Sequence, residues 1–142
     1  MQIVVDPELN ADDAAIIRTG LHAYNDSKVT SLDGHLGILI KDDAGQTVGG
    51  LTAWWYYNWM FVELLFVPDT LRGQDLGTQV MAKAEAYARE HGMIGIWLDT
   101  FGFQARGFYE KLGYKVFGEL PNYPDTHSRF FLQKRLDRKS NP

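Results

Sequence analysis

The sequence contains no cysteine, and this absence excludes disulfide bonds, zinc–thiolate sites and a catalytic thiol. No apolar run reaches the roughly 20 residues that a helix needs to cross a bilayer, and the first residues lack the basic cluster that begins a secretory signal. We therefore expect a cytoplasmic protein that does not bind a membrane. Any group transfer that it catalyses has to proceed without a covalent thiol intermediate.

Basic side chains are in the minority as well. Lys and Arg number 14 against 18 Asp and Glu, which gives a formal net charge of −4. Proteins that bind nucleic acid through its phosphates need basic surfaces, so the composition argues against a nucleic-acid partner. The histidines show no metal-ligand spacing such as HExxH, and we expect no metal.

The length of 142 residues and the hydrophobic content of 45% are those of one globular domain that buries its own core. We expect a single domain over residues 1–136 and a frayed tail over residues 137–142. Apolar periodicity and turn residues predict helices after Asn10 and near residues 76–90 and 105–112, and strands near residues 3–5, 35–41, 47–57, 59–67, 94–100, 114–120 and 128–136. This order predicts an α+β fold with a mixed, largely antiparallel sheet of six to seven strands, about three to four helices, and a βαβ unit in the middle.

The stretch over residues 67–78 leaves a predicted strand, turns, and opens a predicted helix. A helix N-terminus presents unpaired N–H groups and a partial positive charge, and Gly73 and Gly77 would let the backbone approach an anion closely. The pattern therefore suggests a phosphate site. The alternative is a plain strand-to-helix turn that contains glycines, because neither GxxxxGKS/T nor GxGxxG is present.

This loop resembles the pyrophosphate-binding motif Q/R-x-x-G-x-G/A of the GNAT superfamily of N-acetyltransferases. Arg72 stands at the first position of the motif and Gly77 at the last, whereas Asp75 replaces the inner glycine. The run over residues 108–114, FYEKLGY, resembles the fourth-helix signature of the family, F/L-Y-E-K-x-G-F/Y. Residues 63–68 are similar to the family's fourth strand, and Gly102 stands where the family often has asparagine. The likeness covers essentially the whole chain.

The resemblance implies a sheet splayed between strands four and five, acetyl-CoA as co-substrate, and direct attack of an amine on the thioester. Family members pair the pantetheine arm with backbone of the fourth strand, here Phe66 and Val67. The diphosphate would be held by the loop residues Arg72, Gly73, Gln74, Asp75, Leu76, Gly77 and Thr78. Asp75 would either weaken coenzyme binding or point to solvent.

Two residues are candidates for proton transfer. Glu63 is a carboxylate between Val62 and Leu64, so burial would raise its pKa and make it a general base; the alternative is an outward, solvated strand residue. The family motif places the hydroxyl of Tyr109 beside the thioester sulfur as general acid, and the alternative is a core aromatic ring at helical spacing.

An aromatic run covers residues 54–59. Strand alternation sends half of these rings to each face, so Trp54 and Tyr56 form either an aromatic wall around the acceptor amine or a packed or dimer-facing hairpin. Tyr24 could close the same pocket. His127 resembles a histidine that recurs in one branch of small-molecule GNAT enzymes, although a lone histidine in a loop is more often a surface residue.

These observations predict an acetyl-CoA-dependent N-acetyltransferase that modifies a primary amine of a small molecule, with a homodimer as its possible assembly. Acetylation of a protein N-terminus or lysine is one alternative. A non-catalytic acyl-CoA-binding regulatory module is another; Asp75 and Gly102 favour it, and Glu63 and Tyr109 argue against it.

Overall fold

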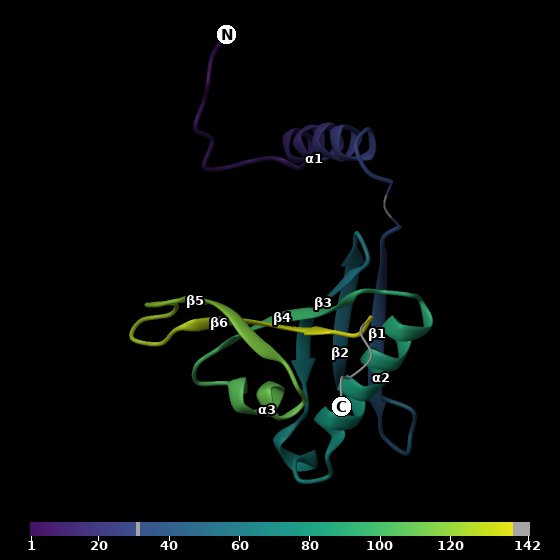
Figure 1. The fold of residues 1–142 in the computed structure, drawn as a ribbon. Coiled ribbons are helices and arrows are strands. Elements are labelled where there is room, and N and C mark those ends of the chain that lie inside the picture. The colour runs from purple at the N-terminus through teal and green to yellow at the C-terminus, as the bar shows by residue number, and fades with distance from the viewer. Residues whose placement is uncertain (31, 138–142) are drawn as a thin grey trace. The chain divides into compact units, whose positions relative to one another are not determined.

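A computed structural model describes residues 1–30 and 32–137 (Figure 1). They form two compact units, one that ends at residue 30 and one that begins at Leu32. The predicted frayed tail, residues 137–142, lies outside the described residues from position 138 onward. Within the described ranges, no helix combines the length and apolar character needed to cross a bilayer.

The unit that ends at residue 30 contains one helix, α1 (Ala11–Asp26). Asn10 is its N-cap, as predicted, because the side-chain oxygen accepts a hydrogen bond of 2.8 Å from the backbone N–H of Asp13. Asp12 and Asp13 place negative charge in the first turn, where it complements the positive end of the helix.

The prediction of a strand over residues 3–5 is wrong. Residues 1–10 are described and form no strand, and the sheet uses only residues from Gly34 onward. The chain turns directly after this run, where the Asp6 carboxylate accepts a hydrogen bond of 2.9 Å from the N–H of Glu8. The branched side chains favour an extended conformation, but a strand also requires a partner for its backbone groups.

The unit that begins at Leu32 confirms the predicted α+β class. Its described residues form a six-stranded sheet in the order β1-β2-β3-β4-β6-β5, in which only β3 and β4 are parallel neighbours. The strands are β1 (Gly34–Lys41), β2 (Thr47–Tyr56), β3 (Trp59–Phe66), β4 (Gly95–Phe101), β5 (Lys115–Leu120) and β6 (Arg129–Arg135). The helices are η1 (Asp69–Leu71), α2 (Leu76–Glu90) and α3 (Arg106–Lys111). The β3–α2–β4 segment is the predicted βαβ unit.

The core lies between the sheet and α2. One apolar stripe of α2 packs against the inward residues of the central strands; the fully buried members include Met81, Ala84, Met60, Ile96 and Leu98. Other aromatic rings pack against one another across strands: Trp54 lies 5.0 Å from Phe61, and Phe61 lies 4.3 Å from Trp97.

The seam between β3 and β4 has two halves. In the closed half the strands pair in register from Trp59↔Gly95 to Val62↔Leu98. The β2–β3 ladder then shifts, because Ala53 pairs with Val62 but Thr52 pairs with Leu64.

Glu63 is therefore the extra residue of a β-bulge. Beyond it lies the open half, in which Leu64–Phe66 stay on β2 while Asp99–Phe101 stay on β6. This separation confirms the predicted splay between the two strands.

Candidate active site

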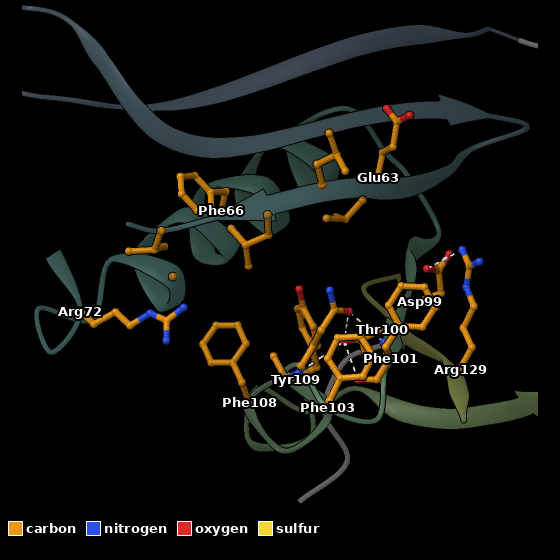
Figure 2. Close-up of a pocket in the computed structure, with 17 residues that line it drawn as sticks. Glu63, Phe66, Arg72, Asp99, Thr100, Phe101, Phe103, Phe108, Tyr109 and Arg129 are labelled. Carbon is orange, nitrogen blue, oxygen red and sulfur yellow. Dashed lines mark hydrogen bonds and ion pairs between the residues drawn. The ribbon is translucent and has the colours of Figure 1, made fainter. Parts of the chain in front are cut away.

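The open half leads into a cleft of about 750 Å³ (Figure 2). Its walls are residues 62–66 from β3 and Val67 after it, residues 99–101 and 103–105 from β4 and the loop after it, Arg72 from the loop before α2, Gly77 from the first turn of α2, Phe108 and Tyr109 from α3, and Arg129 from β6. The edge of β3 that faces this cleft has no strand partner. An extended ligand can therefore bind there as an added strand would, through main-chain hydrogen bonds.

The loop over residues 67–78 forms one end of the site. After the single turn of η1, Gly73 adopts a φ of 88° and α2 begins at Leu76. The N-cap side chain makes no hydrogen bond to the helix, so the first N–H groups of α2 are left for a ligand. A Cβ on Gly77 would lie 3.2 Å from Cζ of Phe108, so a glycine here keeps the loop close to α3. The same loop residues line a hollow of about 410 Å³ that reaches Phe108 and Lys111.

Asp75 occupies the N-cap position of α2 with a φ of 56°. Glycine adopts this left-handed conformation without strain, and Asp and Asn are the other residues that tolerate it. Arg72 forms an ion pair of 3.0 Å with Asp69, and both side chains are largely exposed. In Figure 2 the Arg72 guanidinium points toward Phe108 and into the cleft. Gln74 lies between Arg72 and Asp75 in the sequence, and its carbonyl accepts a hydrogen bond from the side chain of Gln79.

Tyr109 lies in the middle of the cleft, between the loop end and the far end. Its ring is buried, with 7% of the residue exposed, and its hydroxyl is directed across the cleft toward β3 (Figure 2). Burial, and to a smaller degree the charge of Asp99, raises the pKa of Tyr109 to about 12. The hydroxyl therefore keeps its proton at neutral pH. Since no side-chain hydrogen bond among the described residues involves this hydroxyl, it can donate to a ligand.

Glu63 lines the cleft but is exposed, so the predicted burial of this carboxylate is wrong. The apolar neighbours suggested a buried position, but Glu63 follows the buried Val62 and so faces outward, which was the alternative; after the bulge Leu64 is exposed as well. Figure 2 shows its carboxylate directed away from Tyr109.

The far end of the cleft contains a charged pair that the sequence did not single out. Arg129 contacts Asp99 at 2.7 Å, donates a hydrogen bond of 2.9 Å to the hydroxyl of Tyr123, and lies over the ring of Phe101 at 5.3 Å. Its buried Nε has no partner among the described residues, so the guanidinium is held through its two Nη groups. The ring of Phe103 stacks on Phe101 at 5.4 Å. Asp99 is the one charged residue in the strand predicted over residues 94–100, and this was the signal in the sequence that could have pointed to this end of the cleft.

The other predicted acceptor residues lie outside the lining of this cleft. Trp54 packs on Phe61, and Tyr56 packs on Tyr57 at 4.2 Å. His127 is in the loop between β5 and β6, where its ring meets Phe103 edge-on at 5.0 Å.

Tyr24 lies on α1, in the unit that ends at residue 30. A contact of Tyr24 with the acceptor stays a prediction. Among the described residues, no group of three or more His, Cys, Asp or Glu side chains is arranged to hold a metal ion.

The family model of the acetyltransferase (GNAT) family matches residues 7–114. The chain is 34% identical over 137 residues to the acetyltransferase Atu2258 of Agrobacterium fabrum (strain C58 / ATCC 33970), a match that covers 96% of this chain and 100% of that protein. It is 40% identical over 95 residues to the blasticidin-S acetyltransferase of Streptomyces morookaense, covering 66% of this chain and 70% of that one. The crystal structure of an acetyltransferase from Bacillus cereus ATCC 14579 superposes with a TM-score of 0.86 at 29% identity, over 94% of this chain and 98% of the other.

The splayed sheet, the glycine-containing loop before α2 and these matches agree, and the chain belongs to the GNAT family of acetyltransferases. It is an N-acetyltransferase that uses acetyl-CoA as its donor.

Proposed function

We propose that this enzyme transfers the acetyl group directly from coenzyme A to a primary amine of a small molecule. The observation that carries the proposal is the open half of the β3–β4 seam. It presents an unpaired strand edge between a helix N-terminus that suits a diphosphate and the buried hydroxyl of Tyr109. The same cleft continues past Tyr109 to a second end, which leaves room for an acceptor.

The residues present fit the coenzyme. The loop before α2 and the first turn of that helix supply unpaired N–H groups from residues 73–78, and Arg72 adds a positive charge at the mouth of the cleft. Phe66, the last residue of β3, and Val67 after it have no β4 partner, so their backbone groups are available to a pantetheine arm. An arm laid along this edge passes the Tyr109 hydroxyl.

In the reaction, the amine nitrogen forms a bond to the thioester carbonyl carbon, the carbon–sulfur bond breaks, and the amine loses a proton. We assign to Tyr109 a hydrogen bond to the departing sulfur. A thiol has an ordinary pKa of about 8.5, below the value of about 12 for Tyr109, so complete proton transfer from tyrosine to thiolate is uphill. Tyr109 therefore stabilises negative charge as it develops, and the thiolate takes its proton finally from water.

Glu63 is the proposed acceptor of the amine proton. Its exposed position in the bulge, with the carboxylate directed away from Tyr109, favours transfer through a water molecule over direct contact (Figure 2). The matched change is Glu63→Gln, which keeps the shape and removes the charge. We expect kcat near neutral pH to fall by on the order of a hundredfold, the low end for a general base. An unaltered pH–rate profile in Glu63→Gln would mean that solvent or Asp99, and not Glu63, accepts the amine proton.

The acceptor end supports a small, cationic substrate. The ring of Phe103, 56% exposed, offers a face to an ammonium ion at this end, where the Asp99 carboxylate is already paired with Arg129. The similarity to a blasticidin-S acetyltransferase supports the same class of acceptor. Contacts of Tyr24, Trp54, Tyr56 or His127 with the acceptor, a cytoplasmic location, a homodimer and one domain over residues 1–136 remain predictions.

The proposal is tested by acetyl-CoA turnover with a panel of acceptors: blasticidin S, short diamines, a lysine peptide and a peptide with a free N-terminus. Thiol release measures rate, and mass spectrometry of the product measures acetylation. We expect acetylated small amines and little peptide product. A preference for either peptide would overturn the small-molecule assignment, and release of thiol without an acetylated amine would overturn the transfer itself.

Tyr109→Phe tests the site. It retains the buried ring and removes the donor, so kcat should fall by roughly ten- to a thousandfold while the KM for acetyl-CoA holds. Tyr87→Phe is the matched control, because Tyr87 stacks on His91 outside the cleft and should retain full activity. Full kcat in Tyr109→Phe would make Tyr109 a core ring only.

A further inference from the structure

A buried carboxylate on α2 lies outside the lining of the cleft. Glu85 on α2 is 7% exposed, and its Oε1 lies 2.7 Å from Nζ of Lys134 on β6. Its Oε2 accepts a hydrogen bond of 3.3 Å from the hydroxyl of Tyr114, which is 2% exposed. Arg89 adds a longer contact of 3.8 Å at the surface. None of these side chains lines the cleft.

Lys134 also holds the end of α3. Its Nζ donates a hydrogen bond of 2.8 Å to the carbonyl of Leu112, the C-cap residue of that helix. The carbonyl of Tyr109 accepts hydrogen bonds from the N–H groups of Leu112 at 3.0 Å and Tyr114 at 3.1 Å. The ring of Tyr114 packs edge-on against the ring of Tyr109 at 6.0 Å. Lys134 therefore holds the backbone that follows Tyr109, and Glu85 holds the Tyr114 ring that packs beside it.

The helix needs such support from outside. α3 has only six residues and its N-cap, Ala105, makes no side-chain hydrogen bond, so it is too short to be stable by itself. A buried ion pair is seldom more stabilising than apolar residues of the same size, because both charges lose their hydration. The pair instead fixes relative position. The Glu85 carboxylate and the Lys134 ammonium hold α2, α3 and β6 in one arrangement.

We infer that Glu85 and Lys134 are positioning residues that hold the Tyr109 hydroxyl against the thioester. The inference rests on the proposed role of Tyr109. It also explains how α2, whose N-terminus suits the diphosphate, is joined through its middle to the helix that carries the donor. Coenzyme and hydroxyl then share one rigid support.

The test is a double-mutant cycle on kcat. Lys134→Met removes the ammonium and keeps most of the stem. We expect kcat to fall roughly five- to fiftyfold, less than the hundredfold that a 1 Å misplacement costs, with the KM for acetyl-CoA unchanged. In a Tyr109→Phe background the same change should lower kcat less than twofold, because the hydroxyl that it positions is already gone. Additive losses in the two backgrounds would overturn the inference.

Two further variants separate position from stability. Lys115→Met on the neighbouring β5 removes an exposed lysine and should leave kcat and melting temperature unchanged. The double variant Glu85→Gln, Lys134→Met leaves no unpaired buried charge, so it should melt higher than Lys134→Met alone and yet keep the low kcat. Recovery of kcat together with stability would show a purely structural pair.

The two proposals fail in different measurements. Full kcat in Tyr109→Phe refutes the role of Tyr109 and, with it, the positioning of its hydroxyl. A slow Tyr109→Phe combined with additive losses from Lys134→Met refutes the positioning alone.

Discussion

The two halves of the β3–β4 seam use the same pair of strands and differ in what they do. In the closed half, Val62 and Leu98 are 3% and 1% exposed and the strands pair in register. In the open half, Leu64 and Phe66 are each 62% exposed and β3 has no β4 partner. One residue, Glu63, separates a core from a binding site. Changes in the closed half should therefore affect stability, and changes in the open half should affect ligands.

The largest expected difference is in the free energy of unfolding. Leu98→Ala removes a fully buried side chain and should lower it by about 2–5 kcal/mol. Leu64→Ala shortens an exposed side chain and should change it by less than about 0.5 kcal/mol. Urea denaturation of both variants measures the contrast. Equal losses would show that the open half is part of the core.

The coenzyme should respond in the opposite way. Gly77→Glu places bulk and negative charge where the loop meets Phe108, and we expect the affinity for acetyl-CoA to fall about a hundredfold, since like charges in contact cost several kcal/mol. Gly77→Ala is the matched control; its added Cβ, 3.2 Å from Phe108, should have a smaller effect. Calorimetry measures both. Unchanged affinity in Gly77→Glu would remove this loop from the coenzyme site.

Tyr109 faces the cleft of the open half from α3 and should make stability depend on alkaline pH. The unfolded chain loses the tyrosine proton near pH 10, whereas the folded chain keeps it until about pH 12. The free energy of unfolding contributed by Tyr109 is therefore full below pH 10 and declines above it, by about 1.4 kcal/mol at pH 11.

The measurement compares urea denaturation at pH 8 and pH 11 for the wild type and Tyr109→Phe. Tyr114, whose pKa burial also raises, is present in both proteins and cancels in the difference. An identical pH dependence in the two proteins would contradict the raised pKa of Tyr109.

The smallest effect is expected at Asp75. Asp75→Gly removes a negative charge near the diphosphate and suits the left-handed backbone, so the affinity for acetyl-CoA should stay equal or rise by at most about fivefold, the range of an exposed charge interaction. Asp75→Asn removes the charge and keeps a residue that tolerates this conformation. If both variants bind acetyl-CoA more tightly than the wild type and to the same extent, the lost charge is the cause of the gain. Weaker binding by both variants would show that the carboxylate supports the loop.

Local features of the site could be predicted from the sequence, and long-range ones could not. Glycine spacing placed the loop before α2, and helical spacing placed Tyr109 among core residues, because both patterns lie within a few positions of the chain. Burial of Glu63 was inferred from its apolar neighbours, whereas strand alternation places it opposite the buried Val62 and therefore outward; the position that one extra residue moves out of the core is Leu64.

The splay itself came only from the resemblance to a family. The Glu85–Lys134 pair joins residues 49 positions apart, and no periodicity in a single sequence connects them. The same holds for Asp99 and Arg129, which meet only because β4 and β6 are neighbours in the sheet.

The open half also has a consequence for the lifetime of the protein. A strand edge without a partner, flanked by Leu64 and Phe66, is the kind of surface on which chains aggregate. A bound coenzyme covers that edge and, because it binds only the folded chain, raises the free energy of unfolding with its concentration. We therefore expect concentrated, coenzyme-free enzyme to lose solubility first, and added coenzyme A to protect it in storage without any turnover.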